Sequence, residues 1–279
     1  METPGFVPVF MRDINRYFRF KDQLFTSMLH PVLWLALFGF AMAGTFERIL
    51  QSVLPPTGMM VVNYLTYMTP GMIAVTIMFA NLYGGFSVFF DKDWGILREI
   101  LASPMPRRDL VIGISLSAIV KSLIQTTIIV ILGMVLGVTA FSGQSPVQIL
   151  VSIIGIVLFI GIFSTAIICV SLYVAFATSS PEGYQGITTL LSMPFFFASN
   201  ALYPINGLPP VIQEFSYLNP ISHLTDGLRY FIIGDQFSSL GLVFSYSPVQ
   251  ILSSFLYLTV LAVVFFWITV RKINRSVVT

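Results

Sequence analysis

The sequence has 279 residues, of which 56% are hydrophobic and only 9% are charged, and its formal net charge at pH 7 is +2. A soluble domain carries about a quarter of its residues as charges, so this composition excludes an ordinary soluble protein. The single cysteine, Cys169, excludes an intrachain disulfide and a zinc site built from several cysteines.

Residues 1–27 are predicted to form an amphipathic helix at the membrane surface. Val7, Phe10, Ile14 and Phe18 recur at helical spacing, and arginines occupy another face. Such a helix lies with its apolar stripe in the headgroup boundary. A plain anchor ahead of the first membrane span is a sufficient explanation, and contact with a cytoplasmic partner is the alternative.

Uncharged stretches predict six transmembrane helices and an all-α membrane protein. The uncharged stretch from Ser122 to Pro181 is 60 residues long, and a polar turn at 142–146 divides it into two spans. Each span supplies the ~20 apolar residues that cross ~30 Å of hydrocarbon, the fifth being the shortest, and the backbone must bond to itself in lipid, which requires helices. Residues 220–233, at about 14 residues, are too short for a seventh span. The predicted spans are 28–46, 64–90, 110–141, 148–178, 186–203 and 249–270, within a transmembrane domain over 28–270.

The placement of lysine and arginine predicts that both termini are cytoplasmic. Eleven of these residues fall in the N-terminal segment, between spans two and three, and in the basic tail over 271–279, whereas only Arg48 and Arg229 fall on the other side. Cytoplasmic loops carry this excess of positive charge. Lys121 is expected to lie at the cytoplasmic interface, because the 20 residues after it suffice to cross the membrane.

The segment 91–109 between spans two and three is densely charged in a chain that is otherwise nearly uncharged. Its apolar residues repeat at helical spacing, and Pro104 and Pro106 end the predicted short helix. A short helix with one apolar face is suited to docking into a groove of another protein. An ordinary solvated connector is the alternative, and the residue pattern leaves both open.

The segment between spans five and six predicts a second short helix. Asn219 is a suitable N-cap, Pro220 suits the first helical position, and Gly234 suits the residue after the last turn. Asp226 and Arg229 lie three residues apart on the polar face, where they can pair for about 0.3 kcal/mol if exposed. Closure of the outer end of the bundle is favoured over contact with a substrate.

Both segments resemble those of ABC-2 type transporter permeases, most closely the daunorubicin-resistance and nodulation-factor export branch. The family's first cytoplasmic loop carries an acidic-x-acidic-x-Gly-x-Leu helix, a small-residue–Pro turn, and then a basic residue, a leucine and a glycine. The positions that fit this order are Asp91, Asp93, Gly95, Leu97, Leu101, Pro104, Arg107, Leu110 and Gly113. The outer hairpin and its Asn-Pro…Asp-x-x-Arg signature correspond to Tyr203, Pro204, Asn219, Pro220, Asp226 and Arg229.

The resemblance implies that the helix at 91–109 is the coupling helix, which sits in a cleft of an ATP-binding subunit. It assigns Trp94 and Gly95 to this helix, with Gly95 permitting close backbone approach. The docking face would be Ile96, Leu97, Ile100 and Leu101. The polar rim would be Asp91, Arg98, Glu99 and Arg107.

The resemblance also implies a role and a setting for the whole chain. It would be the permease subunit of an ATP-driven exporter in a prokaryotic cell membrane, as a homodimer or paired with a second permease, with no nucleic-acid partner. The sequence has no Gly-x-x-x-x-Gly-Lys-Ser/Thr motif, so ATP and Mg²⁺ would be bound by a separate subunit. An apolar interior favours an amphiphilic or lipid-like cargo, and a glycan stays open.

Polar and aromatic residues at membrane depth are candidates for lining the transport pathway, although interhelical hydrogen bonding and lipid packing are the commoner explanations. These candidates are Asn81, Gln125, Asn200, Phe195 and Phe196.

Two other classes of membrane protein fit the sequence less well. A membrane-embedded enzyme acting on lipids needs converging catalytic groups, but His30 and His223 fall on opposite sides of the predicted topology. A channel or secondary transporter favours charged or broken helices at the midplane, and the spans offer only Lys121.

Overall fold

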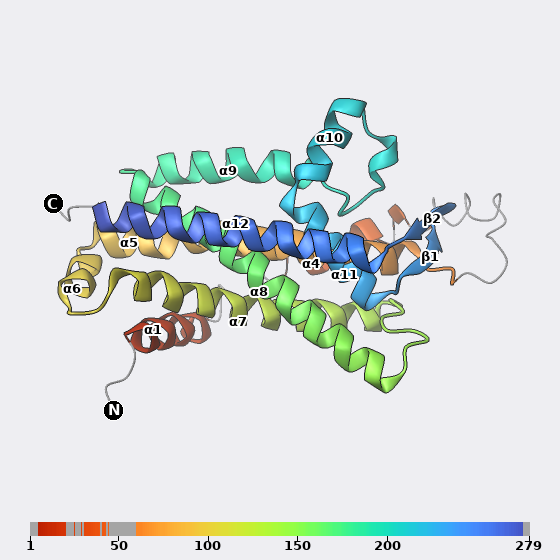
Figure 1. The fold of residues 1–279 in the computed structure, drawn as a ribbon, viewed down its shortest axis with the longest axis horizontal. Coiled ribbons are helices and arrows are strands. Elements are labelled where there is room, and N and C mark those ends of the chain that lie inside the picture. Colours follow the sequence, from red (N-terminus) through yellow and green to blue (C-terminus); the bar gives the residue numbers. More distant parts are fainter. Residues whose placement is uncertain are drawn as a thin grey trace.

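The computed structural model describes residues 5–20, 25, 29, 31–39, 41–42, 44 and 60–275. Helices run along the long axis of an elongated bundle, and the helix over 6–19 and the C-terminal end of the helix over 248–275 lie at the same end of it (Figure 1). This end also carries the short helix α6, Ile96–Ala102, and we call it the α6 end. The opposite end carries two short strands and is called the β-hairpin end.

Four helices are long and apolar enough to cross a membrane. They contain 30, 29, 32 and 28 residues, and at about 1.5 Å per residue each exceeds the ~30 Å of hydrocarbon. The first consists of α4, Tyr64–Gly84, continued by α5, Phe86–Asp93. The others are α7, Arg107–Val135, α8, Pro146–Ala177, and α12, Pro248–Arg275. Predicted spans two, three, four and six are thereby confirmed as helices.

Some helix ends differ from the prediction. Helix α7 ends at Val135 instead of 141, because Gly137 adopts φ +99°, and the Val138 N–H donates to the carbonyl of Gly133 at 2.9 Å. Helix α9, Pro181–Phe197, begins five residues before the predicted 186 and ends six before 203. Its start is fixed by the Ser180 hydroxyl, which accepts from the Gly183 N–H at 3.1 Å.

Only part of the predicted first span falls within the described residues. Residues 31–39 contain a π-helical turn, η1, at Trp34–Phe38. Of the other positions of span 28–46, residues 29, 41, 42 and 44 are described and helical, whereas the rest, together with His30 and Arg48, lie outside the described residues.

The β-hairpin end corrects the all-α expectation. Strands β1, Gln236–Ser239, and β2, Leu242–Ser245, pair antiparallel. They are joined by Leu240 and Gly241, both with positive φ, as a two-residue primed turn requires. The turn lacks the usual Asn-Gly or Asp-Gly signal, which explains why the sequence did not reveal it. This end also holds η2, Ile205–Gly207, α10, Pro210–Leu218, and α11, Pro220–Ile232.

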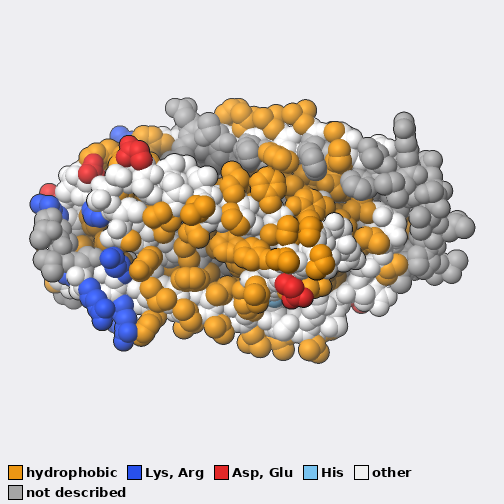
Figure 2. Space-filling model, turned by 90° about the horizontal axis from the view of Figure 1, so that it is seen from above, with side chains coloured by type: hydrophobic (Ala, Val, Ile, Leu, Met, Phe, Trp, Pro, Cys, Tyr) orange, Lys and Arg blue, Asp and Glu red, His pale blue; other side chains and the backbone are white. Residues whose placement is uncertain are grey.

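Two main apolar clusters hold the bundle together. The larger one joins α4, α8, α11 and α12, and the smaller one joins α1, Phe6–Arg19, to α6, α7, α8 and α12 at the α6 end. Large hydrophobic side chains remain exposed along α8, α9 and α12. Figure 2 shows hydrophobic side chains gathered over the middle of the molecule and Lys and Arg at one end, as a lipid-facing surface would have.

Candidate functional site

Helix α6 is set apart from α5 by a tight turn. Gly95 adopts φ +81°, a left-handed conformation that favours glycine, and its carbonyl accepts from the Arg98 N–H at 3.0 Å. At the other end the Ser103 hydroxyl donates to the Ile100 carbonyl at 2.7 Å, and exposed Pro104 follows. The predicted short helix, and its end before the prolines, are thereby confirmed.

The apolar face of α6 points largely inward. Leu97 is 3% exposed within the cluster that contains Leu110 and Ile273, and Ile100 and Leu101 pack against the same cluster. The expectation that Leu97 forms part of a docking face is therefore wrong, because its side chain is buried against its own chain. The surface that stays open consists of Trp94, 63% exposed, Ile96, 39% exposed, and the polar residues Arg98 and Glu99.

Two residues expected on the polar rim join helices. The Asp91 carboxylate is buried and binds Arg12 at 2.8 Å and Arg16 at 3.4 Å, which ties α1 to the end of α5. Arg107 donates to the carbonyls of Ile273 at 2.8 Å and Asn274 at 3.1 Å, near the C-terminal end of α12. Asp91 is thereby corrected from a rim residue to an interhelical contact, whereas half-buried Arg107 makes an interhelical contact and stays a predicted rim residue.

Helix α1 packs on the bundle through a face that sequence analysis missed. Val9 and Tyr17 are buried, and Asp13, midway between them, binds Lys121 and the hydroxyl of Ser117. The spacing of four residues was visible in the sequence, but the apolar stripe of Val7 and its partners was the stronger pattern. Lys121 is thus held by a carboxylate from α1.

The signature residues of α11 form a buried network at the β-hairpin end. Arg229 is 1% exposed, its guanidinium lies 3.9 Å from the ring centroid of Tyr67, and it donates to the Asn200 carbonyl at 2.8 Å. Asp226 accepts from the Asn200 side chain at 2.7 Å. The expected exposed pairing of Asp226 with Arg229 is replaced by contacts of both with Asn200.

The remaining signature residues lie at the ends of α9, η2 and α11; they are Asn219, Pro220, Tyr203 and Pro204. The Asn219 side chain accepts from the Ile221 N–H at 3.0 Å and donates to the Phe195 carbonyl at 2.7 Å. It therefore caps α11, whose first residue is Pro220, and also satisfies the end of α9. The Tyr203 hydroxyl donates to the Phe197 carbonyl, and Pro204 precedes η2.

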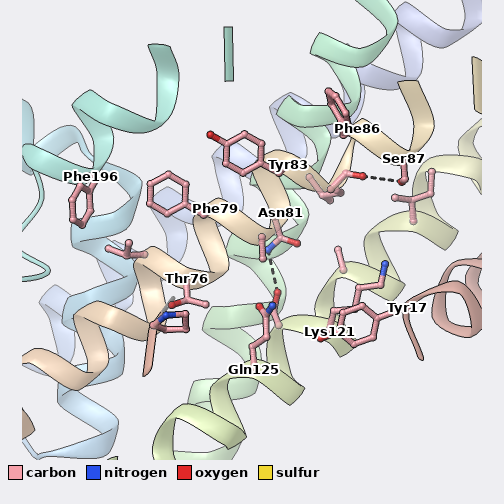
Figure 3. A pocket seen from close by; sticks show the side chains of 18 of the residues that line it. Tyr17, Thr76, Phe79, Asn81, Tyr83, Phe86, Ser87, Lys121, Gln125 and Phe196 are labelled. Atoms are coloured by element: carbon pink, nitrogen blue, oxygen red, sulfur yellow. Dashed lines mark hydrogen bonds between the residues drawn. The ribbon is translucent and has the colours of Figure 1, made fainter. Parts of the chain in front are cut away.

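An elongated cavity of about 880 Å³ lies between α1, η1, α4, α5, α7 and α9 (Figure 3). Three predicted pathway residues, Asn81, Gln125 and Phe196, line it. Two do not: Phe195 stacks on Phe215 with ring centroids 6.1 Å apart, and Asn200 belongs to the Arg229 network.

The lining of the cavity combines aromatic side chains with a few polar ones. Phe79 and Tyr83 stack with their centroids 6.2 Å apart, and Phe196 lies 6.1 Å from Phe79. The Asn81 amide, on the same helix as Phe79 and Tyr83, donates to the Ser122 hydroxyl of α7 at 3.1 Å, as Figure 3 shows beside Gln125. The lining extends along α4 and α5 from residue 72 to residue 90, or about 27 Å at 1.5 Å per residue.

The only described histidine, His223, contacts Ser254 at 2.9 Å and the Tyr217 carbonyl at 3.0 Å. Within the described part of the chain, no three His, Cys, Asp or Glu side chains converge on a common point.

The sequence is similar to those of known transport permeases. The sequence pattern of the family described as ABC-2 type transporter matches residues 6–233. A transport-permease relative from Porphyra purpurea, ycf38, is 29% identical over 210 residues, covering 74% of this chain and 66% of the relative. A daunorubicin resistance ABC transporter permease, DrrB1, from Streptomyces coeruleorubidus is 22% identical over 83% of this chain and 76% of its own length. Nodulation protein J of Rhizobium meliloti is 26% identical over 66% of this chain and 70% of its own.

Proposed function

Because the chain belongs to the ABC-2 type transporter family, we propose that it is the permease subunit of an exporter driven by a separate ATP-binding subunit. In this proposal it crosses the membrane six times, with η1 inside the first span and α9 as the fifth. The α6 end faces the cytoplasm, in keeping with its basic residues. ATP and Mg²⁺ are bound by the partner, and two permease copies, or two related permeases, surround one pathway.

The open surface of α6 carries the proposal. Trp94 and Ile96 expose large apolar side chains at the polar end of the bundle, beside the charged Arg98 and Glu99. Large apolar residues with a charged rim are the composition of a protein-binding surface. On the other side of α6, Leu97 packs against the bundle. A movement of the ATP-binding subunit against the open surface would therefore be transmitted to the transmembrane helices.

The test is assembly with the ATP-binding subunit encoded nearest to this chain. Ile96→Asp should reduce co-purification of the two subunits about tenfold and abolish stimulated ATPase activity, because a carboxylate would be desolvated in the interface. Val211→Asp is the matched control, since Val211 is 82% exposed at the opposite end. Full assembly and full ATPase activity of Ile96→Asp would overturn the assignment of α6.

The cavity supports a cargo that is amphiphilic or lipid-like. Its length of about 27 Å approaches the ~30 Å hydrocarbon thickness, and aromatic residues form its walls. The names of two relatives, which refer to daunorubicin resistance and to nodulation, agree with export but do not define the cargo of this chain. The proposed location of the protein is a prokaryotic cell membrane.

A further inference from the structure

Gln125 is a buried polar residue whose hydrogen-bonding capacity is incompletely used. It lies on α7, is 2% exposed and lines the cavity, and its side-chain oxygen Oε1 has no hydrogen-bond partner. A buried acceptor without a donor costs free energy, and native structures retain few of them. Because Gln125 lies at the cavity wall, a rotation of its side chain would bring this buried oxygen to a donor of a bound molecule.

Three polar side chains that share the cavity with Gln125 are bonded to other groups. Asn81 donates to Ser122, and the Thr76 hydroxyl donates to the Met72 carbonyl at 2.7 Å. Lys121, one helical turn from Gln125, is bound to Asp13. None of these three side chains donates to the Gln125 oxygen.

The rest of the cavity defines the kind of molecule that would supply that donor. The aromatic rings of Phe79, Tyr83 and Phe196 present apolar faces for a flat or alkyl body. The two cations on the lining each have a carboxylate partner: Lys121 is paired with Asp13, and Arg16 shares Asp91 with Arg12. Because Lys121, the cation one helical turn from Gln125, is already paired, an ionic headgroup gains little beside Gln125, and an uncharged donor is favoured there.

We propose that this cavity binds an uncharged amphiphile whose hydroxyl or amide N–H donates to Gln125 Oε1, with its apolar body against Phe79, Tyr83 and Phe196. The proposal refines the cargo class of the proposed exporter and rests on that function for its transport role. Binding itself requires only this chain.

A matched pair of fluorescent probes tests the donor requirement. Pyrenebutanol has a hydroxyl donor, and its methyl ether has the same body without one. Each is titrated into the purified permease in lipid nanodiscs, with empty nanodiscs subtracted, and energy transfer from tryptophan to pyrene is measured. Trp34 lines the cavity, so Trp34→Phe should remove most of the transfer.

The alcohol should bind wild-type protein about fivefold more tightly than the ether, the effect of one neutral hydrogen bond. Gln125→Leu and Gln125→Met should each abolish this preference. Thr127→Val is the control, because Thr127 lies on the same helix with an exposed side chain bonded to the Leu123 carbonyl.

Two outcomes would overturn the proposal: equal binding of both probes by wild-type protein, or an unchanged preference in folded Gln125→Leu and Gln125→Met. The former would indicate that Gln125 meets another protein group, such as a second copy of the chain. Because no ATP-binding subunit is present in this assay, its failure is distinguishable from a failure of ATPase coupling.

Discussion

Arg229 is one of the largest buried side chains. The contacts of its guanidinium explain how a positive charge is tolerated inside the bundle. Its donors meet the carbonyls of Tyr67, Asn200 and Ala201, and its face lies on the Tyr67 ring. A planar guanidinium combines stacking with in-plane donation, which a lysine ammonium does not. The residue therefore pins the loop after α9 to α4.

Arg229→Lys should lower stability by about 2 kcal/mol, because a desolvated cation–π contact and several carbonyl bonds are lost together. The midpoint of thermal unfolding in detergent measures this effect. Arg271→Lys is the control, since Arg271 also lies over a ring, 3.6 Å from the centroid of Trp267, but is exposed. Equal shifts in both variants would show that burial of Arg229 contributes nothing.

A second prediction concerns Asp91, whose buried carboxylate holds Arg12 and Arg16. Asp91→Asn should weaken the docking of α1 by about 1 kcal/mol, a modest value because both arginines are about one-third exposed. Tryptic cleavage within α1 should then accelerate about fivefold. Asp93→Asn, an exposed acid two positions along, should leave the rate unchanged; an equal acceleration there would contradict this role for Asp91.

Among the structural elements, α1 owes its position to a glycine on α7. A Cβ atom added to Gly113 would lie 2.7 Å from the Phe6 carbonyl oxygen and 2.8 Å from Val9 Cβ. Backbone atoms cannot move aside without shifting the whole helix. The absence of a side chain at Gly113 thus sets how closely the two helices approach.

Gly113→Ala should therefore destabilise the protein by about 2 kcal/mol through overpacking. Gly161→Ala is the matched control, because its nearest contact would be 3.9 Å from Ile119 Cδ1, and alanine is the better helix former. Thermal unfolding of the two variants should shift in opposite directions. A neutral Gly113→Ala would mean that α1 is free to move away from α7.

Helix α6 illustrates what the sequence could and could not predict. The spacing of Ile96, Leu97, Ile100 and Leu101 predicted the helix, and Pro104 its end, because both are local properties of the chain. The direction of the apolar face was not local. A partner protein and the chain's own bundle both favour apolar residues, and only the tertiary packing of Leu97 decides between them.

The candidate pathway shows the same limit. Hydropathy located Asn81 and Gln125 at membrane depth, and the cavity brings them together with Phe196. Phe195, adjacent in sequence, points instead to Phe215, because residues one apart on a helix face different directions. The ion pair of Lys121 with Asp13 spans 108 positions, and no local pattern predicts such a contact.

At the scale of the whole molecule, α4 and α5 connect the β-hairpin end with the α6 end. Tyr67 near one end supports Arg229, and Asp91 near the other binds α1. Tyr67 and Asp91 are 24 positions apart in the sequence, which corresponds to about 36 Å of helix, and the cavity lies along this stretch. The helix is interrupted at Gly85, between α4 and α5, where the Gly85 N–H donates to the Ser171 hydroxyl at 2.9 Å.

The proposed orientation gives a prediction that needs no partner protein. A membrane-impermeant maleimide added to intact cells should label Leu242→Cys, 38% exposed at the β-hairpin end, but should label Ile96→Cys only after the cells are opened. Cys169 is buried and contributes little background. Labelling of Ile96→Cys in intact cells would reverse the orientation and remove α6 from the reach of a cytoplasmic ATPase.

The length of α9 has a consequence for the surrounding membrane. Its 17 residues span about 26 Å, which is less than a typical hydrocarbon layer. In the proposed six-span arrangement, lipids next to α9 would therefore have to thin, or flanking groups would have to reach outward. Because α9 forms one wall of the cavity, that thinning is placed where a molecule would pass between bilayer and protein. Host lipids with shorter acyl chains should relieve the mismatch there, which would make export by this protein sensitive to membrane thickness.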